Sequence, residues 1–162
     1  MEQQQIREIY RSTERLTVVL LIFALPAFGM VYLYQNSGTL DWDLPALPKL
    51  GEWLILGAAT AILIAQYVLF HQKLKLTFAQ AELVEKTRIY CEATKQRFWA
   101  LFGVSLLVSL GLLLTQSPMF TLLFAVTMVF FSLAKPSPDR MARLMKLKKE
   151  DRELIREASR PE

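Results

Sequence analysis

The feature that most constrains this chain is where its charged residues are absent. All 19 Lys and Arg and all 15 Asp and Glu lie outside four apolar stretches, at residues 17–35, 53–72, 98–115 and 119–134. A helix rises about 1.5 Å per residue, so roughly 20 apolar residues cross the hydrocarbon core of a bilayer. Four stretches of about this length predict a protein that crosses a membrane several times.

These stretches divide the chain of 162 residues into three regions. Residues 1–16 form a polar, amphipathic arm, residues 17–134 a transmembrane domain, and residues 135–162 a basic tail. The expected fold class is all-α: a four-transmembrane-helix bundle with a helical extension between its second and third spans and an amphipathic basic helix at the C-terminus. The arm is either a helix on the inner membrane surface or a continuation of the first span.

The segment between the second and third spans, residues 73–97, has the pattern of a helix. Residues 79–97 contain no Gly or Pro, and Leu83, Thr87 and Tyr90 follow three- and four-residue steps. Such spacing places side chains on one helical face. We expect a helix that projects from the membrane and continues directly into the third span, so that a helical hairpin forms the main feature on that side.

The distribution of basic residues predicts the orientation. Three Lys or Arg precede the first span, one lies in residues 36–52, six lie in residues 73–97, none lies in residues 116–118, and nine follow the fourth span. Segments rich in Lys and Arg stay on the cytoplasmic side. Both termini and the middle segment are therefore expected in the cytoplasm. This topology also accounts for the net charge of +4, so no nucleic-acid partner is predicted.

Small residues at four-residue spacing mark candidate packing faces. Gly57, Ala61 and Ala65 share one face of the second span, and Ser105 and Ser109 share one face of the third. Small side chains let two membrane helices approach closely. These faces either pack inside the bundle or dock a partner, which would be another membrane protein or a second copy of this chain.

Two polar features of the chain are candidate contact sites. Gln66 is the most polar residue deep in any span, and a buried amide needs a partner, which a Ser or Thr of a neighbouring helix would supply. The tail carries a cluster of basic residues that fixes the topology, docks on an acidic partner or binds the anionic inner leaflet of the bilayer. Its members are Arg140, Arg143, Lys146, Lys148 and Lys149.

The sequence contains little that indicates catalysis or a cofactor. Cys91 and His71 are the sole cysteine and histidine, and Asp41 and Asp43 are too few ligands for a cation. Charged residues within spans are the usual mark of pumps and proton relays, and here there are none. We therefore predict no catalytic residue, no cofactor and no metal, and assign no role to Cys91 or His71.

Several segments carry a resemblance to a known group. They are residues 86–93 (KTRIYCEA), 135–140 (KPSPDR) and 147–151 (LKKED), followed by Leu154 and Ile155. In these segments the chain resembles small four-span membrane proteins of bacteria that have no assigned activity. The resemblance implies a bacterial inner-membrane location and the same topology. Membrane glutathione-transferase-like proteins share the size, but their Glu-Arg and Asn-Glu motifs are missing from the second span.

Three functions are compatible with these observations. The first is a non-enzymatic integral membrane protein that acts through helix–helix contacts, as an accessory or assembly subunit of a membrane complex. The alternative is a homo-oligomeric channel or carrier for a neutral or lipid-like solute, for which Pro26, Gly29 and Gln66 would provide flexibility and polarity. An enzyme using Cys91 or His71 at the inner interface is the third.

Overall fold

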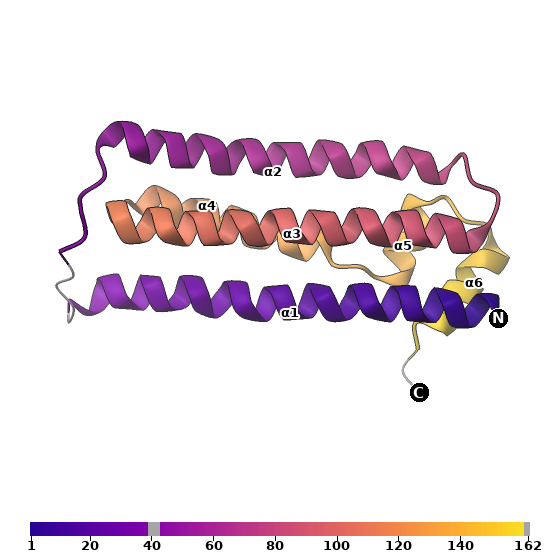
Figure 1. The fold of residues 1–162 in the computed structure, drawn as a ribbon. Coiled ribbons are helices and arrows are strands. Elements are labelled where there is room, and N and C mark those ends of the chain that lie inside the picture. Colours follow the sequence, from indigo (N-terminus) through magenta and orange to yellow (C-terminus); the bar gives the residue numbers. More distant parts are fainter. Residues whose placement is uncertain (39–42, 161–162) are drawn as a thin grey trace.

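The computed structural model describes residues 1–38 and 43–160, and this part of the chain is all-helical (Figure 1). Four long helices lie side by side, and two short helices pack at the end that also holds the N-terminus. In chain order the helices are α1 (Glu2–Ser37), α2 (Lys49–Thr77), α3 (Leu83–Thr115), α4 (Pro118–Ala134), α5 (Pro138–Leu144) and α6 (Lys149–Ala158).

Three of these helices, α1, α2 and α3, are long and apolar enough to cross a membrane. Helix α4 has 17 residues, about 26 Å at the usual rise, and meets α5 at 83° across a short break. A fourth span results if α4 and α5 are counted together. Length and composition are therefore those of a membrane protein with three or four spans.

The N-terminal arm continues into the first span without interruption. Helix α1 runs from Glu2 to Ser37 and ends where Gly38 adopts a left-handed conformation with φ of 61°. Glycine accepts this conformation without a steric penalty, which is why it commonly follows the last turn of a helix. Of the two arrangements open from the sequence, the structure has the arm as an extension of the span.

The helical hairpin predicted for residues 73–97 is present as the adjoining ends of two helices. Helix α2 extends to Thr77, and α3 begins at Leu83 and continues unbroken to Thr115. A tight turn joins α3 to α4, in which Gln116 is left-handed and Pro118 occupies the first turn of α4.

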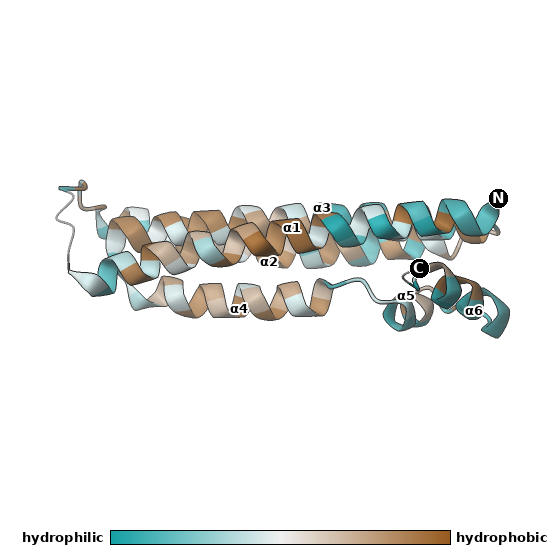
Figure 2. Cartoon of the chain, turned by 90° about the horizontal axis from the view of Figure 1, so that it is seen from below, coloured by the Kyte–Doolittle hydropathy of each residue, from teal (hydrophilic) through white to brown (hydrophobic). Residues whose placement is uncertain are grey.

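Helix α3 is the centre of the fold. Helices α1, α2 and α4 each pack against it, whereas none of these three packs extensively on another. Figure 1 shows α3 between α1 and α2, and Figure 2 shows α4 on a separate side. Buried residues accordingly recur along the length of α3, among them Leu101, Val104, Val108 and Leu112. The helices are organised around one central helix rather than in a closed ring of four.

The tail differs from the single amphipathic helix that the sequence predicted. It forms two short helices, separated at Lys146, whose φ is 51°. Ser137 caps the start of α5, since its Oγ accepts a hydrogen bond from the backbone N–H of Arg140 at 3.3 Å. Both helices fold back onto the rest of the protein, and Met141, Met145 and Ile155 join a core with residues of α1, α2 and α3.

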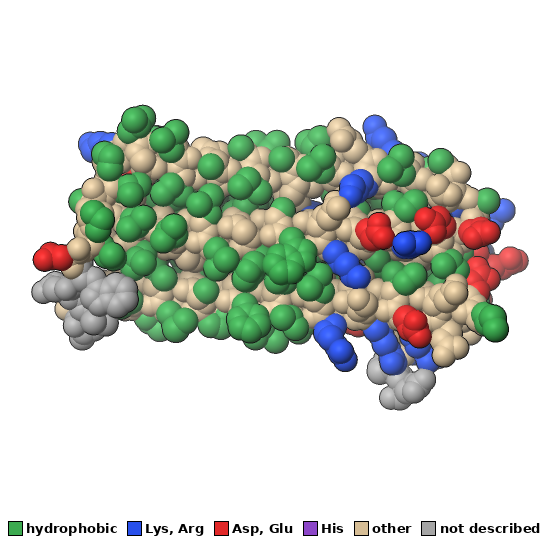
Figure 3. Space-filling view, in the orientation of Figure 1, with side chains coloured by type: hydrophobic (Ala, Val, Ile, Leu, Met, Phe, Trp, Pro, Cys, Tyr) green, Lys and Arg blue, Asp and Glu red, His purple; other side chains and the backbone are tan. Residues whose placement is uncertain are grey.

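Charge and apolarity separate along the long axis. Hydrophobic side chains cover the half of the molecule away from the N-terminus, and Lys, Arg, Asp and Glu gather on the half that holds it (Figure 3). The ribbon coloured by hydropathy has the same division, with hydrophilic residues concentrated at the N-terminal end of α1 and in α5 and α6 (Figure 2). Each half has its own buried cluster, so the charged half is a packed part of the fold.

Candidate functional site

The candidate small-residue face of α2 points away from the protein. Ala59 and Leu63 are buried, whereas Gly57, Ala61 and Ala65 are exposed. Successive helical residues are about 100° apart around the axis, so residues two apart lie on nearly opposite sides. The interpretation of this face as internal packing is therefore wrong, because the side of α2 that contacts α3 is the one with Ala59 and Leu63. The other interpretation of this face, docking of a partner, stays a prediction.

The candidate serines of α3 have the opposite placement. Ser105 and Ser109 are buried within the helical packing. The Oγ of Ser109 donates to the carbonyl of Ser105 at 2.7 Å, and the Oγ of Ser105 donates to the carbonyl of Phe102 at 2.7 Å. Each hydroxyl is thus satisfied by its own helix, which lets the small side chain stay inside an apolar contact. These two positions are internal and are not open to a partner.

Gln66 is buried, but its partner is not the Ser or Thr that the sequence suggested. Its Nε2 donates to the carbonyl of Leu63 at 2.9 Å, and its Oε1 accepts a hydrogen bond from Nε of Arg97 at 2.9 Å. Gln66 is 4% exposed and Arg97 is 7% exposed. The amide therefore links α2 to an arginine of the central helix α3.

Arg97 is the residue that the sequence analysis missed. Its guanidinium carbon lies 4.9 Å from the centroid of the Phe70 ring, a cation–π contact. Within residues 1–38 and 43–160, no carboxylate forms an ion pair with it. Arg97 was counted among the basic residues outside the spans because it precedes residue 98. Two features of the sequence could have indicated its burial. Arg97 directly precedes Phe98 in a helix that is predicted to be unbroken, and the helical hairpin brings it level with the polar Gln66 of the second span.

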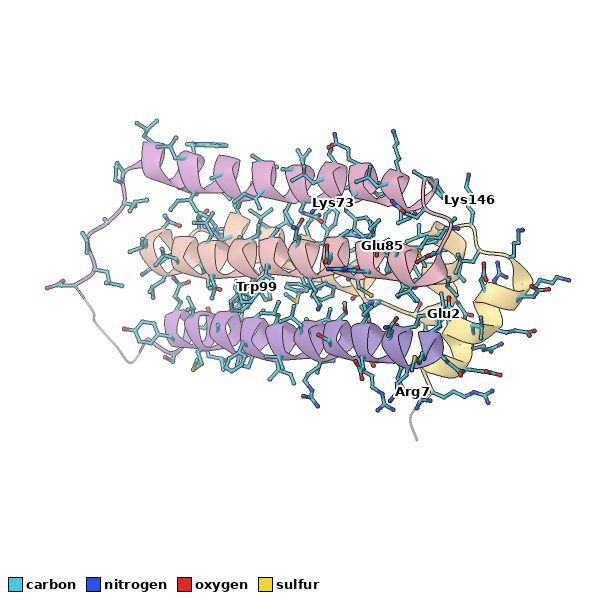
Figure 4. The ribbon with its side chains drawn as sticks, turned by 45° about the vertical axis from the view of Figure 1, so that its right-hand side comes forward. Glu2, Arg7, Lys73, Glu85, Trp99 and Lys146 are labelled. Carbon is cyan, nitrogen blue, oxygen red and sulfur yellow. The ribbon has the colours of Figure 1, made fainter. Side chains whose placement is uncertain are left out.

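The basic residues of the tail divide into two groups. Nη1 of Arg140 donates to the carbonyls of Ser132 and Leu133 near the end of α4, and so satisfies acceptors that a helix terminus leaves free. Nζ of Lys146 lies 5.4 Å from the centroid of the Phe78 ring, at the charged end of the molecule (Figure 4). The remaining candidates are exposed, and they are Arg143, Lys148 and Lys149.

Most of the tail's apolar residues are covered by the protein, and Leu154 is the exposed exception. Met141 and Ile155 pack in one cluster with Ile6, Leu74 and other residues from the charged half. An amphipathic helix that lies on a bilayer must bury its apolar face in the lipid. Here most of that face is occupied, so contact of the tail with a membrane or an acidic partner depends mainly on its exposed basic side chains.

The two residues considered for catalysis lie on different helices, Cys91 on α3 and His71 on α2. Cys91 lies outside the apolar part of α3 and is buried, which raises the pKa of its thiol to about 11. Nδ1 of His71 is 2.9 Å from the carbonyl of Tyr67, one turn earlier on α2. In the described part of the chain, no three His, Cys, Asp or Glu residues are grouped to hold a metal, and Asp41 lies outside that part.

Comparison with known proteins adds no relative to this picture. No protein-family model, no curated protein and no solved structure matches the chain.

Proposed function

We propose that this chain is an integral membrane protein without a catalytic centre, which acts through helix–helix contacts as an accessory or assembly subunit of a membrane complex. The observation that carries the proposal is the outward position of Gly57, Ala61 and Ala65 on α2. A surface that faced only lipid would gain nothing from small residues, whereas a docked helix gains close van der Waals contact.

The geometry of this face suits a second helix. A Cβ added at Gly57 would meet no atom within 4 Å. The exposed Leu54 and Val68 lie on the same side of α2, one turn or less beyond the small residues, and would flank an incoming helix. The occupant we propose is an apolar transmembrane helix of another protein, packed along α2 on the side opposite α3.

The orientation proposed with this function is the one that basic residues favour: both termini on the cytoplasmic side of a bacterial inner membrane. The positive-inside count supports it. So does the clustering of the N-terminus, α5, α6 and the turn between α2 and α3 at one end of the molecule (Figure 1). That end would stand in the cytoplasm beside the anionic leaflet, with Arg143, Lys148 and Lys149 exposed.

Photocrosslinking in native membranes tests the proposed contact, with a benzophenone maleimide attached to one introduced cysteine, because the photoprobe inserts into C–H bonds and needs no cysteine in the partner. A single cysteine at Ala61, introduced as A61C together with C91A, should crosslink to a different polypeptide, identified by mass spectrometry. The matched control is A59C in the same background, because Ala59 is on the same helix but buried against α3. Absence of a heteromeric product at A61C, or equal products at both positions, would overturn the accessory role.

A substitution series gives a second measurement. A61L fills the groove that a partner needs, so partner recovery on gentle extraction should fall severalfold, while the control T60L should not lower it. Thr60 is exposed on a different side of α2, and leucine has a similar bulk at either position. Recovery that is unchanged in A61L would contradict the proposed face.

A carrier for a lipid-like solute is the second candidate, because an apolar groove opens between α1 and α4. It has a volume of about 330 Å³, and its lining includes Leu21, Leu25, Phe98 and Met128. Lys135 stands at one end of the groove. Transfer of a labelled lipid between the leaflets of reconstituted vesicles, abolished by L21W, would favour this function; no transfer above protein-free vesicles would reject it.

A further inference from the structure

A basic pocket lies between α1 and α3, on the charged side of the border with the apolar half. Its volume is about 560 Å³. Arg11 and Arg15 of α1 and Lys95 of α3 line it, so two elements far apart in sequence bring positive charge to one place. Glu8 is the only acidic residue in the lining, which leaves an excess of two positive charges.

The three basic groups are available to a ligand. Within the described ranges, Glu8 forms no ion pair with Arg11, Arg15 or Lys95, so it does not neutralise its basic neighbours by direct pairing. Nζ of Lys95 donates to Oγ of Ser12 at 3.1 Å. This bond orients the ammonium group toward α1 and leaves its other N–H donors for an anion.

The pocket sits at the depth where a lipid headgroup would lie. Arg15 is the last charged residue before the apolar stretch of α1, and the pocket wall continues into that stretch through Leu16 and Val19. Trp99 follows Lys95 by one turn on α3, and its side chain is 55% exposed (Figure 4). Tryptophan favours the headgroup level of a membrane because its ring is part apolar and part polar.

We propose that this pocket binds the phosphate of an anionic phospholipid, with the lipid's glycerol and first methylene groups against Leu16, Val19 and Trp99. Arg15 and Lys95 would hold the phosphate, since charge-assisted hydrogen bonds to phosphate are strong and arginine can make two at once. A soluble phosphate would use the cations but not the apolar wall. The site depends on membrane insertion and not on the partner of α2, so either proposal can fail without the other.

Native mass spectrometry of the full chain in detergent tests the site, with phosphatidylglycerol and phosphatidylcholine offered in equal amounts. The wild-type protein should retain phosphatidylglycerol preferentially. The double variant R15Q/K95Q should lower that preference about tenfold, because two phosphate contacts are lost. The control K75Q/K86Q removes the same charge from residues outside the pocket and should leave the preference unchanged. E8Q should raise the preference for phosphatidylglycerol, since it neutralises the one carboxylate that lines the pocket.

Four outcomes would overturn the proposal. They are an absence of preference in the wild-type protein, an equal loss in both double variants, no response to E8Q, and displacement of the lipid by millimolar inorganic phosphate, which would identify a soluble anion as the ligand. Circular dichroism of each variant establishes that the helices are intact, and E8Q keeps the test decisive if R15Q/K95Q does not fold.

Discussion

Nε of Arg97 donates a hydrogen bond to Oε1 of Gln66 at 2.9 Å, and so joins the central helix α3 to α2 by a polar contact inside the protein. The Phe70 ring, also on α2, covers the same guanidinium. Burial of a charged group is costly unless its donors find acceptors. The relative position of α2 and α3 is therefore specified by a polar contact in addition to apolar packing.

Replacing the acceptor should destabilise the protein. Q66L keeps most of the side-chain volume but leaves a donor of Arg97 unpaired, so we expect the free energy of unfolding to fall by about 1–3 kcal/mol. Unfolding in mixed detergent, monitored by circular dichroism, measures this change in free energy. Q66E retains an acceptor for Arg97, so its free energy of unfolding should fall much less than that of Q66L. Q72L, at an exposed position of the same helix, is the control; equal stability of Q66L and Q72L would show that the contact contributes nothing.

Gly111 of α3 should not tolerate a larger side chain. A Cβ at this position would overlap the ring of Phe120 on α4, which is fully buried. G111A should therefore lower the free energy of unfolding by about 1–3 kcal/mol through overpacking. G103A on the same helix is the control, because no atom lies within 4 Å of its added Cβ. A loss that is equal in the two variants would contradict the close approach of α3 and α4.

The sequence was sufficient to predict the four long helices, although it left open where α1 begins. Charge-free stretches are long-range signals that need no knowledge of neighbours, and the absence of Gly and Pro from residues 79–97 predicted the helical hairpin. The tail was predicted less well. Its apolar residues were recognised, but the sequence did not indicate that Met141 and Ile155 would be buried against the protein's own charged half.

The sequence was insufficient to decide which side of a helix is used. On α2, small residues and larger ones recur at similar spacing, so Gly57 and Leu63 each belong to a plausible packing face. Only the position of α3 decides that Leu63 is inside. For the same reason Arg97 was assigned by its place in the chain rather than by its neighbours, although it is buried against Gln66 and Phe70.

The attachment of α6 should depend on Ile155. This side chain is 1% exposed, whereas the adjacent Leu154 is 38% exposed. I155A should weaken docking of α6 by about 2 kcal/mol, which corresponds to a roughly thirtyfold increase in its open population. Trypsin cleavage at Arg152 and Arg156, followed by mass spectrometry, measures that population. L154A is the control and should change the rate of trypsin cleavage little. Faster cleavage in L154A than in I155A would contradict the docked arrangement of the tail.

Cys91 should be almost inert toward thiol reagents while the protein is folded. The thiol is 1% exposed, and desolvation raises its pKa from 9.0 to about 11, so at pH 7 to 8 it is a buried, protonated group rather than a thiolate. Maleimide labelling should therefore be at least about 100-fold slower than that of E92C in a C91A background, since Glu92 is exposed on the same turn. Unfolding in strong detergent should make the two rates similar, because the difference comes from burial and not from the thiol itself. Rapid labelling of Cys91 in the folded protein would contradict this burial and restore the possibility of a reactive cysteine at the charged end.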